Sequence, residues 1–464
     1  MTTTSGTQTL ARWLTALTPG DIPGAVGRVA IRSLVDTLGV MLAGSATSVA
    51  GLARRVISLN AAAGDAAVAG DALRVSAPAA AFANGTAAHA LDFDDNCYAG
   101  FVHGSAVIVP AALAVAQARR ADGAALLAAL VAGAECQYRI GMALGRTLYD
   151  RGWWTTGVLG AIGACAAAVK LLGLDTDAAA RALGLAIAGA GGMKSVFGSD
   201  AKPLLAGRAA EAGVTAALLA EQGAVGPLDA LEHVYGLAAL FNDGRLDARW
   251  LNAPADDWCL IAPGLDVKRI PVCLSSHAAV DGVLQLTAEH GIEWSRIAAV
   301  VCDVPPVVAA NLIYPRPRTG RQGQFSLPFA VAASLLFGEL TLEHLDDALM
   351  ADKTLTALMD RVSMVSGPRW NDSRMLEVAP EGAEVTLRLH DGDTFSCFIP
   401  KAIGSADYPL SDKALENKFL RCAGGIMPPA AAQRLVSTLW QITEIADVHE
   451  LADMMAPAGQ ATDE

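Results

Sequence analysis

Three carboxylates and a histidine crowd one short stretch of the chain, "HALDFDDNCYAGFVHGSAV", which runs from His89 to Val107. Asp92, Asp94 and Asp95 lie within four positions of one another, and His103 follows after a short loop. A carboxylate beside an imidazole orients the ring and tunes its pKa. This pattern favours a general base, with His103 in that role.

Other interpretations of the acidic stretch stay open at this point. A phosphatase-type aspartate nucleophile normally follows a buried strand, whereas "NGTAAHAL" reads as a helix. A metal site would need more ligands, and the nearest candidates are only Asn96 and His103, so no metal is predicted. The stretch could also be a capping or turn cluster on a solvated loop, with His103 merely filling space.

Composition restricts the classes of function. A chain of 464 residues exceeds what one core usually supports, which predicts two domains. Apolar residues make up 53% and charged residues 17%, a balance that fits a large interior and a homodimer interface. The net charge of -13 argues against a nucleic-acid or anionic-membrane partner, since both need clustered Lys and Arg. Local cations would have to hold any anionic substrate.

Motifs for cofactors, disulfides and export do not stand out. The 8 cysteines are scattered without a CxxC pair, as expected of buried thiols in a reducing compartment. The chain has no phosphate loop, no strand-placed GxGxxG, no HExxH and no GxSxG, so no cofactor is predicted. The N-terminus lacks a signal-peptide pattern, and the apolar runs "AALLAALVAGA" and "GVLGAIGACAAAV" are too short to span a bilayer. We expect a cytoplasmic protein.

The pattern of residues changes from helical to strand-like and back along the chain. Up to about residue 262 it is alanine-rich and helical, with "PGAVGRVAIRSLVDTLGVMLAG" a typical amphipathic helix. "RIAAVVCDVPP" and "EVTLRLHDGDTFSCFIP" then read as strands, the second with a turn at Asp391-Gly392. The tail is helical again. The predicted fold is mainly α: a large all-helical domain formed by both chain ends (1–265 and 401–464) and a smaller α+β domain (266–400).

Several segments in this order resemble the MmgE/PrpD family, whose members include 2-methylcitrate dehydratase, cis-aconitate decarboxylase and iminodisuccinate epimerase. They are "ANGTAAHALDFDD" with the following His103 and Ser105, "AKPLLAGRAAEAGVTAALLAEQGAVGP", "KRIPVCLSSHAAVDG", "FSLPFAVAASLL" and "PLSDKALENKF". The resemblance covers nearly the whole chain. It implies a dimeric enzyme without metal or organic cofactor, in which an α+β lid and a helical domain enclose a site for small di- or tricarboxylates.

The resemblance also implies roles for particular residues. Removing a proton next to a carboxylate creates an enediolate-like charge, which requires a base and nearby cations. The family's functional positions fall on Asp92, His103, Lys202, Lys268 and His277. Asp92 would orient the base His103, His277 would be the acid, and the two lysines would hold carboxylates, Lys202 within the catalytic set. Further candidates for substrate contact are Asn96, Trp154, Arg269 and Tyr314.

The chain departs from the family pattern beside these positions. Trp154 stands where members commonly carry a histidine, and an indole cannot titrate and donates one hydrogen bond only. Gly104 replaces a proline, which we expect to loosen the backbone beside His103. Ala309 stands at the tyrosine position of the decarboxylase branch, with Tyr314 nearby as a stand-in. These changes favour a less charged acid as substrate.

The sequence therefore predicts a cofactor-independent lyase or isomerase that abstracts a proton next to a carboxylate of a small organic acid. The alternative is a weakly active or non-catalytic paralogue that binds a ligand or partner in the same cleft. The five polar residues at the functional positions favour the enzyme.

Overall fold

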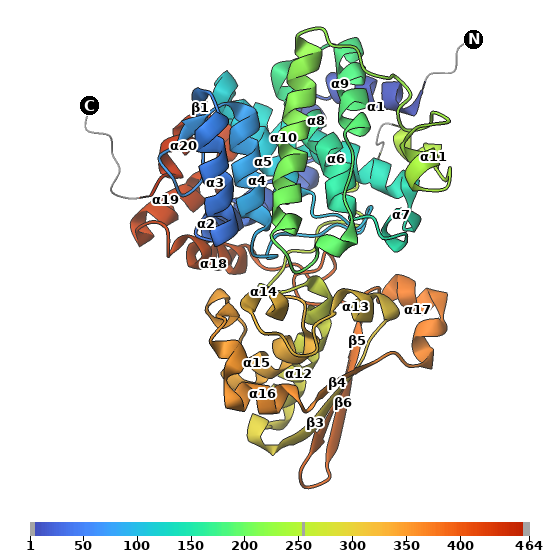
Figure 1. Ribbon diagram of the computed structural model, residues 1–464, viewed down its shortest axis with the longest axis vertical. Coiled ribbons are helices and arrows are strands. Elements are labelled where there is room, and N and C mark those ends of the chain that lie inside the picture. Colours follow the sequence, from blue (N-terminus) through green and yellow to red (C-terminus); the bar gives the residue numbers. More distant parts are fainter. Residues whose placement is uncertain (1–4, 253–255, 458–464) are drawn as a thin grey trace. The chain divides into compact units, whose positions relative to one another are not determined.

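The computed structural model describes residues 5–252 and 256–457, which fold into two compact units (Figure 1). The first unit comprises the chain up to Asp266 together with the chain from Ser411 onward, and the second is Val267–Leu410. Helices dominate and the sheets are small, so the predicted mainly α class is confirmed.

The first unit is a helical assembly to which both ends of the chain contribute. Its helices are α1 (Gly6–Ala16), α2 (Gly24–Ser45), α3 (Ser48–Asn60), α4 (Ala77–His89), α5 (Ser105–Arg119), α6 (Gly123–Leu144), α7 (Thr147–Asp150), α8 (Thr155–Leu172), α9 (Thr176–Ala188), α10 (Ala201–Glu221), α11 (Leu237–Phe241), α18 (Asp412–Ala423), α19 (Pro429–Trp440) and α20 (Glu450–Met454). The expectation of an all-helical domain is wrong in one respect: β1 (Ala63–Ala67) and β2 (Arg74–Val75) pair antiparallel. The segment "AGDAA" of β1 has none of the β-branched alternation that marks a strand.

Close contact between α4 and α10 sets the geometry around the acidic stretch. A Cβ on Gly85 of α4 would lie 3.0 Å from the Cα of Gly207 on α10. A Cβ on Gly207 would lie 2.3 Å from the carbonyl oxygen of Phe82. Only glycine permits backbones to approach this closely. The end of α4 and the beginning of α10 are thereby held at a defined separation.

The C-terminal helix α18 returns to pack on α2. Gly39 of α2 leaves room for Phe419, whose Cδ2 would lie 2.9 Å from an added Cβ. On the same helix, Lys418 reaches inward: its Nζ lies 2.7 Å from Asp36 Oδ1 and donates to the carbonyl oxygen of Phe93 at 2.8 Å. A residue near the C-terminus therefore supports the loop that carries Asp92–Asp95.

The second unit is built on a four-stranded sheet in the order β4-β3-β5-β6. The strands are β3 (Ile297–Asp303), β4 (Val362–Val365), β5 (Ala383–Leu389) and β6 (Thr394–Ile399), with β3 and β4 parallel and the other pairs antiparallel. Its helices are α12 (His277–His290), α13 (Pro306–Asn311), α14 (Gly320–Gly323), α15 (Leu327–Phe337), α16 (Lys353–Met359) and α17 (Ser373–Val378). The predicted hairpin turn at Asp391-Gly392 is confirmed between β5 and β6, and Val385, Leu387 and Leu389 are all buried.

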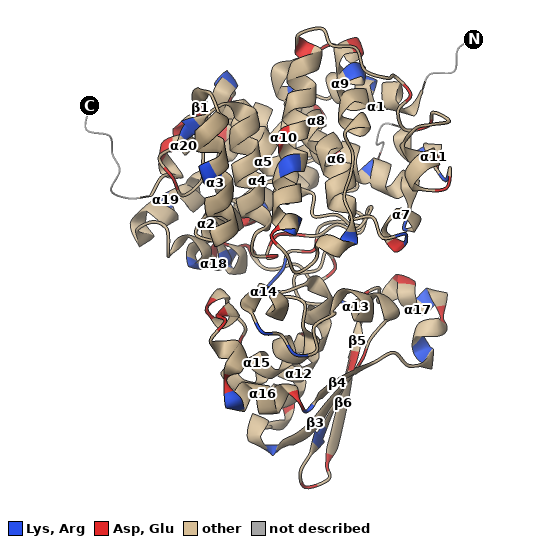
Figure 2. Cartoon of the chain, viewed as in Figure 1, with Lys and Arg blue, Asp and Glu red and all other residues tan. Residues whose placement is uncertain are grey.

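One helix among the described residues, α8, has the length and apolar composition of a membrane span, and it is longer than the sequence suggested. Of this stretch, 83% is buried, which is typical of a core helix. Helices α2 and α3 pass the same test only as a joined pair, bent by 84°. Charged residues gather instead on outer helices and loops (Figure 2). Burial within the fold accounts for the apolar character of α8.

Candidate active site

The acidic stretch forms the connection between α4, which ends at His89, and α5, which begins at Ser105. Backbone hydrogen bonds fasten this loop at two places. Cys97 and Val102 bond to each other reciprocally at 2.8 and 3.0 Å, and Asn96 does the same with Asp266 at 2.9 and 2.8 Å. Asp92 has a φ of 50°, a left-handed conformation that aspartate tolerates better than most residues and that redirects the chain directly after α4.

Asp94 lies between two histidines. Its Oδ2 is 2.8 Å from Nδ1 of His89 and 3.3 Å from Nδ1 of His103. The side chains of His89 and Asp94 are fully buried, whereas that of His103 is 15% exposed. Because of this difference in exposure, His103 is the histidine of the two that small molecules can reach.

The sequence predicts Asp92 as the carboxylate that orients His103, and the structure places Asp94 there instead.

Burial and neighbouring charges give His89 and Asp94 different protonation states. Burial lowers the pKa of His89 to about 4, so this imidazole is neutral at ordinary pH. Burial by itself would raise the pKa of Asp94, but the charges and hydrogen bonds of His89 and His103 hold it well below its usual range. The cluster thus presents an ionised carboxylate to His103.

The same three side chains could in principle hold a metal ion. Ligand atoms of His89, Asp94 and His103 lie within 4.8 Å of one another. Two imidazoles and one carboxylate suit zinc or another divalent transition metal. Both Nδ1 atoms, however, already lie at hydrogen-bond distance from acceptor oxygens of Asp94 and Asp95. Hydrogen bonding accounts for the geometry of the cluster.

Asp92 instead forms a buried ion pair with Lys202, the second residue of α10. Both side chains are nearly covered, at 5% and 6% exposure. The Lys202 ammonium also lies 5.2 Å from the ring centroid of Phe197. The structure therefore joins two of the predicted site residues, in a pairing that the sequence did not indicate.

The first turn of α8 forms a wall beside the histidines. Trp154 precedes this helix, is 2% exposed, and has its ring centroid 5.4 Å from that of His89. The backbone N–H of His103 donates to Oγ1 of Thr156 at 2.9 Å, and Oγ1 of Thr155 donates to the carbonyl oxygen of Phe101. An apolar ring thus lies next to His89.

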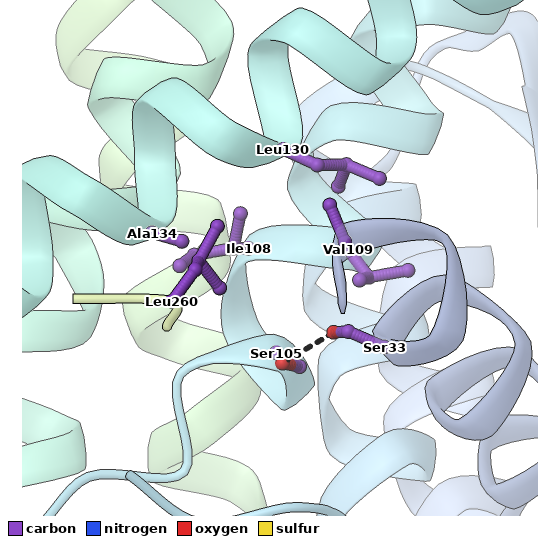
Figure 3. Close-up of a pocket in the computed structure, with 8 residues that line it drawn as sticks. Ser33, Ser105, Ile108, Val109, Leu130, Ala134 and Leu260 are labelled. Atoms are coloured by element: carbon purple, nitrogen blue, oxygen red, sulfur yellow. Dashed lines mark hydrogen bonds between the residues drawn. The ribbon is translucent and has the colours of Figure 1, made fainter. Parts of the chain in front are cut away.

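A second buried layer lies behind His103. Ser33 donates to the Oγ of Ser105 at 2.7 Å, and Ser105 donates to Oδ2 of Asp95 at 2.6 Å. Figure 3 shows the two serines at one end of a mostly apolar cavity between α2, α5 and α6. The cavity has room for about one water molecule, so it is not a site for an organic acid.

Gly104 has a steric purpose. A Cβ at this position would lie 2.4 Å from the hydroxyl oxygen and 2.7 Å from Cε1 of Tyr138, which is fully buried. This contact gives glycine a steric reason at this position, and the expectation that it loosens the backbone stays a prediction. Glycine lets α5 begin against the tyrosine ring, directly after His103.

The remaining predicted site residues lie in the second unit. Lys268 and His277 are buried, and His277 begins α12, with its Nε2 at 3.2 Å from the carbonyl oxygen of Val272. Arg269 forms an ion pair with Asp281, so its guanidinium already has a carboxylate partner. Tyr314 is partly buried, and its backbone N–H donates to the carbonyl oxygen of Phe325. The roles of these four residues stay predictions.

The sequence pattern does not single out His89 or Asp94. His89 reads as the last residue of a helix, and Asp94 is one of three similar carboxylates. The available signal is that a histidine at a helix end precedes a run of aspartates, with a second histidine in the same loop. That signal indicates a shared cluster without saying which carboxylate takes part.

Replacing Asp95 with asparagine should stabilise the protein above neutral pH. Burial, together with the charges of Asp36 and Asp94, raises the Asp95 pKa to about 7. The folded state then binds this proton more tightly than the unfolded state, so the cost of ionising Asp95 grows from about pH 4 to pH 7 and is complete above that. The amide oxygen of the new side chain would still accept from Ser105. We expect a gain of about 2–4 kcal/mol at pH 8 and much less at pH 5, by urea unfolding. A gain independent of pH would contradict the assignment.

Similarity to known proteins extends over nearly the whole chain. Residues 8–248 match the MmgE/PrpD N-terminal domain and residues 270–442 match the MmgE/PrpD C-terminal domain. A cis-aconitate decarboxylase-like protein of Aspergillus oryzae is 27% identical, with 97% of each chain covered. The cis-aconitate decarboxylases of Homo sapiens and Mus musculus are 27% and 26% identical, and each alignment covers 97% of this chain and 94% or 93% of theirs.

Proposed function

Because the chain belongs to the MmgE/PrpD family, we propose that it is a cofactor-independent lyase or isomerase acting on a small organic acid. Its reaction begins with removal of a proton next to a carboxylate. The relatives named as decarboxylases support a lyase-type activity in general. The observation that carries the proposal is His103, partly exposed and held through Nδ1 by the buried Asp94.

The first step follows from this geometry. Nε2 of His103 takes the proton, and the C–H electron pair moves into the adjacent carboxyl group as an enediolate. The imidazolium that forms is stabilised by the ionised Asp94. Lys202, fixed by Asp92, supplies a positive charge for the enediolate oxygens. The enediolate then expels a group from the neighbouring carbon or is reprotonated. His277 as the acid and Lys268 as a second anion holder belong to this proposal.

Trp154 favours a substrate with fewer carboxylates than citrate-like acids carry. An indole offers one N–H and no positive charge, whereas a histidine at this position could bind a carboxylate as a cation. A less charged acid remains compatible with one carboxylate held by Lys202.

The homodimer predicted from composition is likewise part of the proposal.

Proton NMR in deuterium oxide tests the proposed function. The purified protein would be incubated with 2-methylcitrate, cis-aconitate, iminodisuccinate and monocarboxylic analogues, beside a folded His103→Ala control. We expect deuterium incorporation or conversion with at least one acid, reduced at least about a hundredfold in the control. Binding of an acid, seen as a raised melting temperature, without exchange in either protein would favour the non-catalytic paralogue.

Exchanging Trp154 for histidine should widen the range of acids. A protonated imidazole adds one charge-assisted hydrogen bond, so we expect KM for a tricarboxylate to fall about tenfold. Trp154→Phe, which keeps an apolar ring, is the matched control and should leave the preference unchanged. Equal KM changes in both variants would show that this position does not discriminate between substrates by their charge.

A further inference from the structure

We propose that His89 is a positioning residue that holds the carboxylate of Asp94 in place beside the base His103, whose proton lies on Nδ1 and whose lone pair lies on Nε2. The consequence for turnover rests on the proposed function. The proton arrangement itself is a property of the free protein.

The acceptors around His103 fix its tautomer. Nδ1 of His103 lies 2.9 Å from the backbone carbonyl oxygen of Asp95 and 3.3 Å from Oδ2 of Asp94. A carbonyl oxygen and an ionised carboxylate accept hydrogen bonds but cannot donate them. Nδ1 must therefore carry the proton, and in the neutral ring the basic lone pair is on Nε2. This is the nitrogen that a base needs to have free.

His89 holds the carboxylate from its other side. Its Nδ1 lies 2.8 Å from the same Oδ2 of Asp94, so this nitrogen too must be the protonated one. The two rings are 4.8 Å apart between centroids, with the carboxylate oxygen shared between them. Without the bond from His89, Asp94 could turn about its χ angles and Oδ2 could leave Nδ1 of His103.

The neutrality of His89 matters as much as its hydrogen bond. Burial is the main reason that this ring stays uncharged, and the positive charge of Lys202 acts in the same direction on its pKa. Trp154 covers it at a centroid distance of 5.4 Å. A charged His89 would neutralise Asp94. A neutral one orients the carboxylate and leaves its negative charge available when His103 takes a proton.

A matched pair of substitutions separates positioning from mere packing. In His89→Asn the side-chain N–H can occupy the place of Nδ1–H, whereas His89→Leu fills a similar volume without a donor. We expect His89→Asn to keep kcat within about fivefold and His89→Leu to lose about a hundredfold in kcat with little change in KM. Urea unfolding ensures that only folded protein is compared. Equal kcat losses in the two variants would overturn the proposal.

Nitrogen-15 NMR of histidine-labelled protein tests the arrangement without any substrate. His103→Ala and His89→Asn identify the signals of the two rings by their loss. We expect both rings to be Nδ1–H tautomers in the unsubstituted protein, and His103 to keep this form in both His89 variants because the Asp95 carbonyl oxygen still accepts from its Nδ1. The Nδ1 resonance of His103 should shift in His89→Leu, where Asp94 loses its place, and stay unchanged in His89→Asn. An Nε2–H tautomer of His103 in the unsubstituted protein would overturn the inference. The expected tautomers in a protein inert towards every acid would refute the proposed function alone.

Discussion

Replacing Lys202 with methionine should abolish turnover and also cost about 3–5 kcal/mol of folding free energy, because Asp92 would keep its buried charge without this partner. The pair is nearly covered by protein, so bulk water screens the remaining carboxylate only weakly. Turnover should fall because the enediolate loses the cation that stabilises it. Urea unfolding measures the first effect, and the NMR assay measures the second.

The double variant Asp92→Asn/Lys202→Met separates the two effects. It removes both charges, so most of the lost stability should return, while turnover should stay absent. Asparagine tolerates the left-handed conformation at position 92 almost as well as aspartate. If the double variant recovered turnover, Lys202 would be a structural ion-pair partner and no part of the reaction.

Adding one methyl group at Gly104 should both destabilise the protein and slow turnover. The Cβ would fall 2.4 Å from the Tyr138 hydroxyl oxygen, far inside contact distance, and the tyrosine ring is enclosed in the core. We expect Gly104→Ala to lose about 1–3 kcal/mol of stability. The neighbouring His103 should shift with the backbone, so kcat should fall at least about tenfold.

Gly24→Ala is the matched control for this steric argument. Gly24 begins α2, and an added Cβ there would have nothing within 4 Å. This substitution should be neutral or slightly stabilising, since alanine favours helix formation. Equal stability and equal turnover in the two alanine variants would show that the contact with Tyr138 can relax freely.

The sequence was sufficient for those features that depend on local patterns. The helical character of "NGTAAHAL" in α4 and the hairpin around Asp391-Gly392 follow from an alanine-rich run and a turn pair. The mainly α class follows from the same kind of signal repeated along the chain. These features are encoded within about twenty neighbouring residues, which is the range over which such patterns carry information.

The arrangement within the site was beyond such patterns. Which of Asp92 and Asp94 contacts His103 depends on the direction of each side chain, and the φ of 50° at Asp92 changes that direction. The purpose of Gly104 depends on Tyr138, a residue of another helix. Both are consequences of tertiary packing, and one sequence alone does not contain the distances that decide them.

The support that Lys418 gives to the acidic loop has a consequence for how the protein is made. Asp36 and Phe93 are synthesised well before the ammonium that contacts both, since Lys418 follows Phe93 by 325 residues. The nascent chain can form α2 and α4 before this cation exists. The loop that carries His103 is therefore fully supported only once α18 has been synthesised, so a chain that stops before α18 would carry the site residues without this contact.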